Sequence, residues 1–584
     1  MKLKIVFLYL VVFLQIPCFA KEGIAWVSFD KDIFANAKAQ KKLVLLDLKA
    51  NWCHWCHVMD DSTYSNKEVI DYLNEHYISA EADQDKRPDL ANKYRDYGWP
   101  ATIIFDANGN EIVKRSGYLS PKNFLRLLKA VVADPSPEEE SFNYAALQPD
   151  SSSFAQHGYT ELLKKFNESL DYKLGGFDFY QKYVDYDTYE YGLHHAKQDS
   201  ALNHWVQASI TNSANGIFDE VWGGVYQYST NSDWHHEHFE KLLSVQSRYI
   251  KMYCWYYKTY HQQWALQKAE KIAEYCNRFL KAESGGFYNA QDADVVQGKH
   301  SGEYFKLTNE QRLKVGMPAI DKNIFTNVNA QLSDALVVLW ASSGKQEYLT
   351  TASATINYLE QHAGLPEGGF RHTEKDYNGI VSLSDNLYMA MALNTLYRAT
   401  ADKNYLKKLT KLATFIDEHY STKYGAYLSY YGNTGLAAEP VISENINLCR
   451  FFNLYSHVSG YKTYKTKAEK IFSFLTTPAI VDKLSTEPGI LTAYDELSKE
   501  PLTATFLIYK KNEDAESSLR ETIAYPDFYF LNNTYFSQDQ VPADKKDMFS
   551  SFDSNVLFFC TSSYCSMPIT SLSQTVKTLY KNKP

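Results

Sequence analysis

The sequence contains few cysteines, no concentrated basic patch and, beyond its N-terminus, no long apolar run. Eight cysteines in 584 residues are too few for disulfide bonds to hold the fold together. A formal net charge of −9 without a basic patch excludes a generic nucleic-acid or anionic-membrane binder. No later segment approaches the roughly 18 consecutive apolar residues of a membrane-spanning helix. The length exceeds what one hydrophobic core usually serves, so the sequence predicts two or more globular domains.

The N-terminus has the three parts of a signal peptide. Two lysines precede the apolar run Ile5–Leu14, and small residues follow as far as Ala20. The apolar run is too short to span a membrane. We therefore expect residues 1–20 to be a signal peptide and the mature protein to be exported, periplasmic or secreted, with no membrane span. Lipidation of Cys18 is the alternative.

The stretch ANWCHWCHVMDD, residues 50–61, holds two cysteines and two histidines within five positions. C-x-x-C is a dithiol redox motif, C-x-x-C-H can attach a c-type haem, and two Cys with two His can bind zinc. Neighbouring residues of a short helix point about 100° apart, so these four side chains cannot converge on one zinc ion. Haem attachment gives no reason for the residues around the motif. We therefore favour a redox-active dithiol without metal or cofactor, with an inert cysteine pair as the alternative.

The segments around the motif predict an α/β domain over residues 21–133. A strand over 41–48 precedes the cysteines, and a helix follows them. The next helix begins at SNKEVIDYLNEHY, where Ser65 and Glu68 are spaced as a capping box. The remaining elements are a strand at 77–82, a helix at 90–97, a hairpin turning at Asn108-Gly109, and a helix that starts at Ser120-Pro121.

This order of elements is that of a thioredoxin-like domain, and three further positions resemble thioredoxins. Asp47 stands where thioredoxins keep a buried carboxylate beneath the second cysteine, and Trp52 directly precedes the first cysteine. Pro100 matches the cis-proline that faces the dithiol in that family. A cis X-Pro bond is uncommon enough to mark a required geometry.

The chemistry follows from the position of the first cysteine. Cys53 at a helix N-terminus is the expected nucleophile, because free N–H groups and the helix dipole favour its thiolate. A protonated His54 would favour that thiolate further. Cys56, one turn later, resolves the mixed disulfide, with Asp47 as the proton acceptor. The redox direction stays open.

A longer resemblance covers nearly the whole mature chain. C-H-W-C-H-V-M resembles the signature of the spermatogenesis-associated thioredoxin-domain proteins and their bacterial relatives, in which a thioredoxin-like domain is joined to an (α/α)6 toroid of the six-hairpin glycosidase type. Departures at Glu237 and Val328 weaken the transfer of a substrate. Further matches to that family are Asp219, Gly223, Gly224, Trp234, His238, Phe239, Glu240, Lys241, Asp292, Asp294, Glu303, Asp385 and the terminal FFCTSSYCSMPIT.

The rest of the chain divides into a linker, a helical region and a small α/β appendage. Residues 134–141 are rich in proline, serine and charge, as in a linker. Over 142–500, helical patterns alternate with glycine pairs, which favour helix C-termini. This irregular hairpin repeat is compatible with a toroid, and the family resemblance supplies its closure into six hairpins. Residues 501–584 read as the appendage, where Cys560 and Cys565 form either a local disulfide or free thiols.

The resemblance implies that loops at one end of the toroid line a cleft for sugars. Each residue also has a structural interpretation, since the aspartates can cap turns and Glu240 can pair with Lys241. The neighbouring histidines lack the further ligands that a metal site needs. The candidate residues of the cleft are Trp234, His238, Glu240, Asp292, Asp294 and Asp385.

The sequence therefore predicts an exported thiol–disulfide oxidoreductase fused to an (α/α)6 toroid. Its partners would be protein thiols or disulfides, with carbohydrate as a second ligand class and no nucleic acid. One alternative is a carbohydrate-active or carbohydrate-binding toroid in which the thioredoxin domain is accessory. A non-catalytic scaffold is the other.

Overall fold

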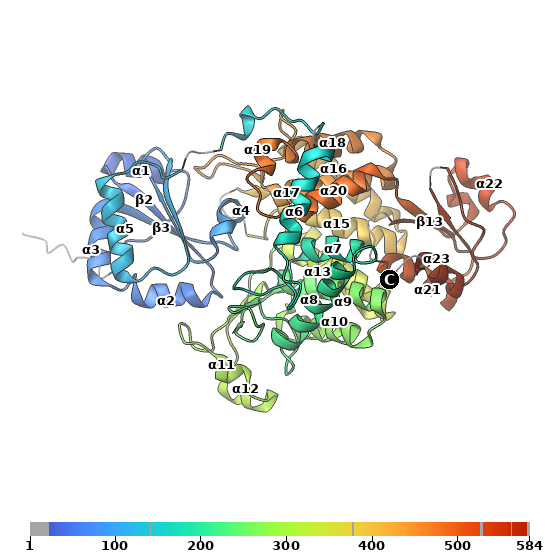
Figure 1. The fold of residues 1–584 in the computed structure, drawn as a ribbon, viewed down its shortest axis with the longest axis horizontal. Coiled ribbons are helices and arrows are strands. Elements are labelled where there is room, and N and C mark those ends of the chain that lie inside the picture. Colours follow the sequence, from blue (N-terminus) through green and yellow to red (C-terminus); the bar gives the residue numbers. More distant parts are fainter. Residues whose placement is uncertain are drawn as a thin grey trace, which may run out of the picture.

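A computed structural model describes residues 23–139, 142–152, 154–375, 379–525, 530–561 and 563–580 (Figure 1). The expected signal peptide, with Cys18, lies outside the described residues, as does the end of the expected linker at 140–141. Three regions follow one another along the long axis of the molecule: a sheet-containing domain, a ring of helices and a second small sheet. None of the described helices combines the length and hydrophobicity that a bilayer span requires.

The first domain is a five-stranded sheet of order β1-β3-β2-β4-β5, with β4 antiparallel to β2. The central strand β2 contributes side chains to two hydrophobic cores, one on each face of the sheet. Leu45 packs in one core, and Val44 and Leu46 pack in the other. The strands are β1 (Val27–Ser28), β2 (Leu43–Lys49), β3 (Tyr77–Asp83), β4 (Ala101–Phe105) and β5 (Glu111–Ser116). The helices are α1 (Ile33–Gln40), α2 (His54–Ser62), α3 (Lys67–His76), α4 (Pro88–Tyr94) and α5 (Pro121–Ala133), with a short 3-10 turn, η1 (Arg95–Tyr97).

The predicted capping residue of α3 is wrong by one position. Asn66, not Ser65, is the N-cap, and its side-chain oxygen accepts hydrogen bonds from the backbone N–H groups of Glu68 and Val69. The Ser65 hydroxyl instead donates to the carbonyl of Asp61, at the end of α2. An asparagine directly beside the serine offers the better-placed acceptor.

Twelve helices of the described residues form a closed double ring. Each inner helix contacts the next, and α20 contacts α7, which closes the circle. The inner helices are α7 (Tyr186–His195), α9 (Leu243–Tyr260), α13 (Thr326–Ser343), α15 (Leu383–Thr400), α17 (Ile442–Ser459) and α20 (Pro488–Ser498). The outer helices are α6 (Tyr159–Glu168), α8 (Ser200–Gly216), α10 (Gln263–Tyr275), α14 (Gln346–His362), α16 (Lys403–Tyr420) and α18 (Lys462–Leu475). The predicted fold class, a thioredoxin-like domain followed by an (α/α)6 toroid, is confirmed.

A repeated side-chain device joins the glycine turns to the inner helices. In four hairpins, the side-chain amide of a Gln or Asn near the start of the inner helix bonds both backbone groups of the residue that follows the glycine turn. Its oxygen accepts a hydrogen bond from that residue's N–H, and its nitrogen donates one to that residue's carbonyl oxygen. These buried amides replace the backbone hydrogen bonds that the turn cannot make internally. The pairs are Gln246 with Val225, Asn329 with Phe287, Asn386 with Phe370, and Asn445 with Tyr427.

Loops of the ring carry a three-stranded ribbon that faces the first domain. Its strands β8 (Lys241–Leu242), β9 (Ala290–Gln291) and β10 (Ile320–Asp321) pair antiparallel, with β9 in the centre. Two short helices, α11 (Gly302–Phe305) and α12 (Asn309–Val315), lie between β9 and β10 in the chain. The ribbon positions Glu240 immediately before β8 and Asp292 immediately after β9.

The C-terminal region is a three-stranded sheet of order β14-β13-β15 on the far side of the ring (Figure 1). Its helix α21 packs against the inner helices α13 and α15. The elements are β13 (Leu502–Leu507), α21 (Glu513–Ala524), β14 (Phe530–Tyr535), α22 (Lys546–Phe549), β15 (Val556–Cys560) and α23 (Leu572–Tyr580). This α/β appendage therefore completes the predicted multidomain architecture.

Candidate functional site

The two cysteines of the C-H-W-C motif form a disulfide at the start of α2. Cys53 is the N-cap of the helix, and its sulfur accepts a hydrogen bond from the backbone N–H of Cys56 at 3.2 Å. In the reduced state the same N–H and the positive end of the helix would stabilise a thiolate on Cys53. The predicted position of the nucleophile thus matches the geometry of α2.

Both sulfur-bearing residues are covered. Cys53 is 4% exposed and Cys56 is 2% exposed, and they pack in one apolar cluster with Ala290 of the toroid. Trp99 packs against the same cluster, and the following Trp99–Pro100 bond is cis, as the sequence predicted. The toroid therefore supplies part of the wall around the disulfide.

Asp47 lies in the sheet beneath this helix and is almost fully buried, at 1% exposed. Neither carboxylate oxygen has a hydrogen-bond partner among the described residues. Burial raises the pKa of Asp47 to about 7, with the charge of Lys49 opposing that shift. A carboxyl group with this pKa can accept or release a proton near neutral pH, which is the role expected of it beside Cys56.

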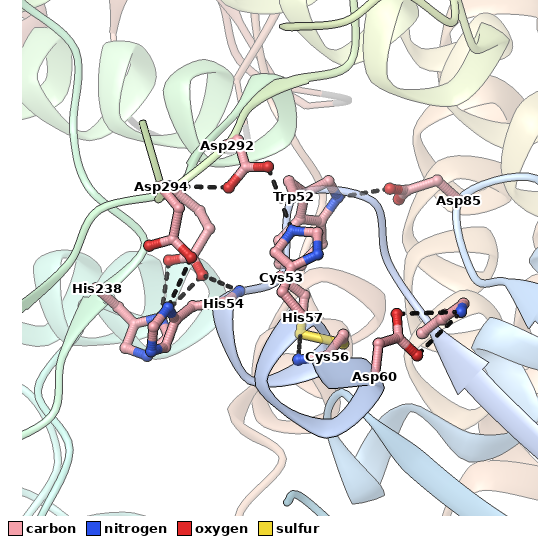
Figure 2. The surroundings of a disulfide bond; sticks show 12 residues. Trp52, Cys53, His54, Cys56, His57, Asp60, Asp85, His238, Asp292 and Asp294 are labelled. Carbon is pink, nitrogen blue, oxygen red and sulfur yellow. Dashed lines mark hydrogen bonds and ion pairs between the residues drawn. A yellow bond between two sulfur atoms is a disulfide. The ribbon is translucent and has the colours of Figure 1, made fainter. Parts of the chain in front are cut away.

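Two aspartates of a toroid loop meet the histidines of the motif. His54 Nδ1 lies 2.7 Å from an Asp294 carboxylate oxygen, and His57 Nε2 lies 3.3 Å from one of Asp292. The backbone N–H of Asp294 donates to Asp292, which fixes the two carboxylates relative to each other. Figure 2 shows both aspartates pointing from the toroid toward the start of α2. The motif and the loop therefore form one site.

Glu240 adds a third carboxylate at the N-terminus of α2. Its carboxylate accepts a hydrogen bond from the backbone N–H of His54, with a nitrogen–oxygen distance of 3.5 Å. The same carboxylate lies 2.7 Å from His238 Nδ1. A carboxylate at this position is favoured by the helix dipole. It also competes with a Cys53 thiolate for the same positive potential, so the toroid modifies the electrostatics of the dithiol.

Burial and carboxylates set the charge of these groups. Burial lowers the pKa of His57, but the hydrogen bond and charge of Asp292 and the charge of Asp294 outweigh it, so the pKa is raised. The indole of Trp52 donates to Asp85 at 2.6 Å. Burial and the neighbouring charge of Asp83 raise the pKa of Asp85 to about 7. The site therefore includes two buried carboxyl groups, Asp47 and Asp85, whose pKa lies near neutral pH.

Four of the six predicted toroid candidates gather at α2: His238, Glu240, Asp292 and Asp294. Asp385 contacts the thioredoxin-like domain through His372. Its carboxylate lies 2.9 Å from His372 Nδ1, and His372 Nε2 lies 2.6 Å from the backbone oxygen of Asp85. Trp234 is not in the site, since it is 1% exposed and its indole donates to the carbonyl of Leu174. The four candidates at α2 lie against the thioredoxin-like domain rather than in an open cleft.

Sequence reasoning missed part of the site and misassigned one ion pair. Asp85 and His372 carry no motif, although the acidic run EADQD at the end of β3 is a signal for Asp85. The suggested pair of Glu240 with Lys241 is wrong. Lys241 is buried and instead pairs with Asp219 at 2.6 Å, as does Arg312 at 2.7 Å. Glu240 precedes β8 and contacts His54 and His238, whereas Lys241, the first residue of β8, contacts the buried Asp219.

A pocket adjoins the disulfide between the two domains. Its volume is about 360 Å³, and its walls include Trp52, Cys56, His57, Asp292 and Asp321. This is about twelve times the volume of one water molecule in the liquid. A small thiol, or a single cysteine side chain, fits this space beside Cys56. Among the described residues, no group of three or more His, Cys, Asp or Glu has the arrangement of a metal site.

Comparisons with known proteins agree with this architecture. Residues 14–146 match the family model described as Thioredox_DsbH, protein of unknown function, DUF255. Spermatogenesis-associated protein 20 of Rattus norvegicus is 26% identical over 400 residues, 62% of this chain and 47% of that protein. The human protein of the same name is 26% identical over 335 residues, 50% of this chain and 42% of its own length. The predicted resemblance is confirmed. The chain spans about half the length of these curated relatives.

Other similarities cover single parts of the chain. The thiol:disulfide interchange protein DsbD of Yersinia pestis is 34% identical over 98 residues, 16% of each chain. A sugar epimerase from a ruminal bacterium aligns with a TM-score of 0.45 at 14% identity, covering 55% of this chain and 86% of that one. A thioredoxin from Thermus thermophilus covers 19% of this chain and 88% of its own, at 22% identity and a TM-score of 0.18.

The first prediction concerns the buried Asp47. Its pKa is about 7 in the folded protein and 3.8 in its ordinary state, so between pH 4 and 7 the unfolded chain releases a proton that the folded chain keeps. Stability contributed by this group therefore falls over that window and stays low above it. Asp47→Asn should stabilise the protein at pH 8 by on the order of 4 kcal/mol, and much less at pH 4. Urea unfolding at both pH values measures this, and equal effects would contradict it.

The second prediction concerns the contact of His57 with Asp292. A histidine whose pKa is raised by folding contributes stability that is complete below its ordinary pKa and is lost as pH rises through its folded pKa. The contact should therefore hold at pH 6 and weaken in mildly alkaline solution. Asp292→Asn should accelerate reduction of Cys53–Cys56 by dithiothreitol roughly tenfold at pH 6, since hydrogen bonds to charged groups contribute about 1.5–3 kcal/mol.

The ratio of the variant rate to the wild-type rate should fall between pH 6 and pH 9, because the charged contact of the wild type weakens as pH rises through the raised pKa of His57. Taking this ratio removes the ordinary pH dependence of thiol exchange. Asp71→Asn, which alters an exposed ion pair on α3, is the matched control and should leave the rate unchanged. A ratio that is the same at both pH values would show that the contact does not cover the disulfide.

Proposed function

We propose that this protein is an exported thiol–disulfide oxidoreductase whose dithiol, Cys53 and Cys56, is covered by its own toroid. The observation that carries the proposal is the sulfur of Cys53 at the N-cap of α2, accepting a backbone N–H of the first turn. The cis bond before Pro100 and the buried Asp47 support the same chemistry. The signal-peptide pattern of residues 1–20 is the basis for export to the periplasm or the outside.

The reaction conserves atoms and electrons within the thiols. The Cys53 thiolate attacks one sulfur of a partner disulfide, which forms a mixed disulfide and releases the other partner sulfur as a thiolate. Cys56 gives its proton to Asp47 and attacks Cys53, which restores the Cys53–Cys56 disulfide and releases the second partner thiolate. Two electrons pass from the protein to the partner, and the reverse sequence oxidises a partner dithiol.

The toroid determines what can reach the dithiol. With α2 held by Asp292 and Asp294, the pocket beside Cys56 offers an approach with room for a small thiol or one cysteine side chain. A folded protein partner needs α2 to leave the ribbon. The polar contacts that hold the start of α2, two histidine–carboxylate pairs and the amide of His54, are of the kind that can open and close without unfolding either domain. The segment of α4 and η1 keeps its own contacts with the ring through Asn92, Lys93 and Arg95.

A second candidate function is carbohydrate binding within the ring. The inner helices enclose a cavity of about 120 Å³ whose walls include Asp185, Asp187, Arg248 and Tyr388, and Arg95 of the thioredoxin-like domain closes one side. Carboxylates, arginine and tyrosine are groups that bind hydroxyl-rich ligands. None of the six predicted cleft residues lines this cavity.

The third prediction tests the oxidoreductase. Cys56→Ser removes the resolving sulfur, so Cys53 should capture partners as mixed disulfides that dithiothreitol releases. Combining it with Asp292→Asn and Asp294→Asn should raise the captured amount severalfold, because both histidine–carboxylate contacts that hold α2 on the ribbon are then weakened. The matched control is Cys53→Ser with Cys56 retained, which should capture nothing at this site. Equal capture by both single-cysteine variants, or none by either, contradicts the proposal.

The fourth prediction tests the ring cavity. A panel of neutral hexoses and disaccharides should include one that raises the unfolding temperature of the wild-type protein. Asp187→Asn should abolish that shift, whereas Asn357→Asp on an exposed part of α14 should preserve it. Arg95→Ala should strengthen the effect by opening the cavity. If no sugar shifts the unfolding temperature of either the wild type or Arg95→Ala, carbohydrate binding is excluded as the role of this cavity.

A further inference from the structure

The appendage holds a second disulfide, between Cys560 and Cys565. Cys560 is the last residue of β15, an edge strand of the small sheet, and Cys565 lies in the segment that returns along it. Both residues are partly exposed, unlike the covered Cys53 and Cys56. Tyr564, at 67% exposed, lies beside the pair. Cys560–Cys565 is therefore more accessible to reagents in solution than the Cys53–Cys56 disulfide, which the toroid covers.

The local fold does not depend on this disulfide. The backbone N–H of Thr561 donates to Tyr564, and that of Ser566 donates to Phe559. Further along, Leu557 and Ile569 exchange both of their backbone hydrogen bonds. The returning segment is thus bonded to β15 without the sulfur atoms. A disulfide that closes so short a loop also adds little restriction to the unfolded chain, so its structural contribution is small.

The remaining described cysteines cannot compete for exchange. Cys254, Cys276 and Cys449 are buried thiols on helices of the toroid or at their ends. Burial raises the pKa of Cys254 and Cys276 to about 12 and raises that of Cys449 as well. Because the thiolate is the reactive form, these groups are inert near neutral pH.

We propose that Cys560–Cys565 is a second redox-active site, which exchanges electrons with thiol reductants from solution. Exposed disulfides are the labile and regulatory ones, whereas structural disulfides resist reduction by glutathione. A thiolate of the reductant attacks one of the two sulfurs and forms a mixed disulfide, and the other sulfur leaves as a thiolate and takes a proton. A second reductant thiolate resolves the mixed disulfide, so the pair gains two electrons and the reductant becomes a disulfide.

The chain's own dithiol is not the reductant within one molecule. The thioredoxin-like domain and the appendage lie at opposite ends of the ring (Figure 1). Electrons therefore reach Cys560–Cys565 from another molecule. This site is independent of the proposed chemistry at Cys53, and it can be tested with that chemistry removed.

The test uses the full-length chain carrying Cys53→Ser and Cys56→Ser, so that Cys560–Cys565 is the only remaining disulfide of the described part. The protein is equilibrated in native buffer with mixtures of reduced and oxidised glutathione, alkylated, and analysed by peptide mass. We expect reversible reduction of Cys560–Cys565 across the glutathione series while the unfolding temperature stays unchanged. Cys254, Cys276 and Cys449 serve as internal controls and should remain unalkylated until the protein is unfolded.

Two results would overturn the proposal. The first is a disulfide that stays oxidised in a large excess of reduced glutathione, as a structural disulfide does. The second is reduction that occurs only together with unfolding of the appendage. In a second arm, Cys565→Ser added to the same background should leave Cys560 able to form a mixed disulfide with oxidised glutathione, and absence of this adduct in the folded protein would also contradict the assignment.

Discussion

The cover over the dithiol depends on one set of contacts, in which carboxylates of toroid loops hold the start of α2 beside the dithiol. Asp294 and Asp292 contact His54 and His57 on successive turns of α2, and Glu240 accepts the backbone N–H at the start of that helix. The same turn of helix carries the sulfur chemistry. Whatever strengthens these contacts buries the disulfide, and whatever weakens them exposes it.

This boundary gives the large helical ring a role in the redox chemistry. A free thioredoxin-like domain would present Cys53 to solvent, but here the ribbon β8–β10 packs against it, and a pocket lies beside Cys56. The toroid also places a negative charge next to the helix end that would stabilise a thiolate. The ring is therefore both a cover and an electrostatic neighbour, and its protonatable groups make that cover sensitive to pH.

The sequence was sufficient for the parts that local patterns determine. The strand before the motif, the nucleophile at the helix start and the cis-proline follow from spacing within about fifty residues, and the glycine pairs signal the hairpins. The contacts between His54 and Asp294, and between Asp85 and His372, join residues more than two hundred positions apart, so no local pattern reveals them. The amides that clamp the glycine turns, such as Asn386, were likewise hidden, because an asparagine in a helix has no distinctive spacing. The candidate carboxylates were found by family resemblance, but their target, the dithiol helix, emerged only from the fold.

Hydrogen–deuterium exchange of the oxidised protein measures the closed boundary most directly. The account predicts that backbone amides of residues 53–58 and of the loop at 292–298 are protected together. In a variant carrying Asp292→Asn and Asp294→Asn, both segments should lose protection to the same extent, while strands β2 and β4 keep theirs. Rapid exchange of both segments in the unmodified protein, or loss of protection in one without the other, would contradict the claim that the toroid holds the dithiol closed.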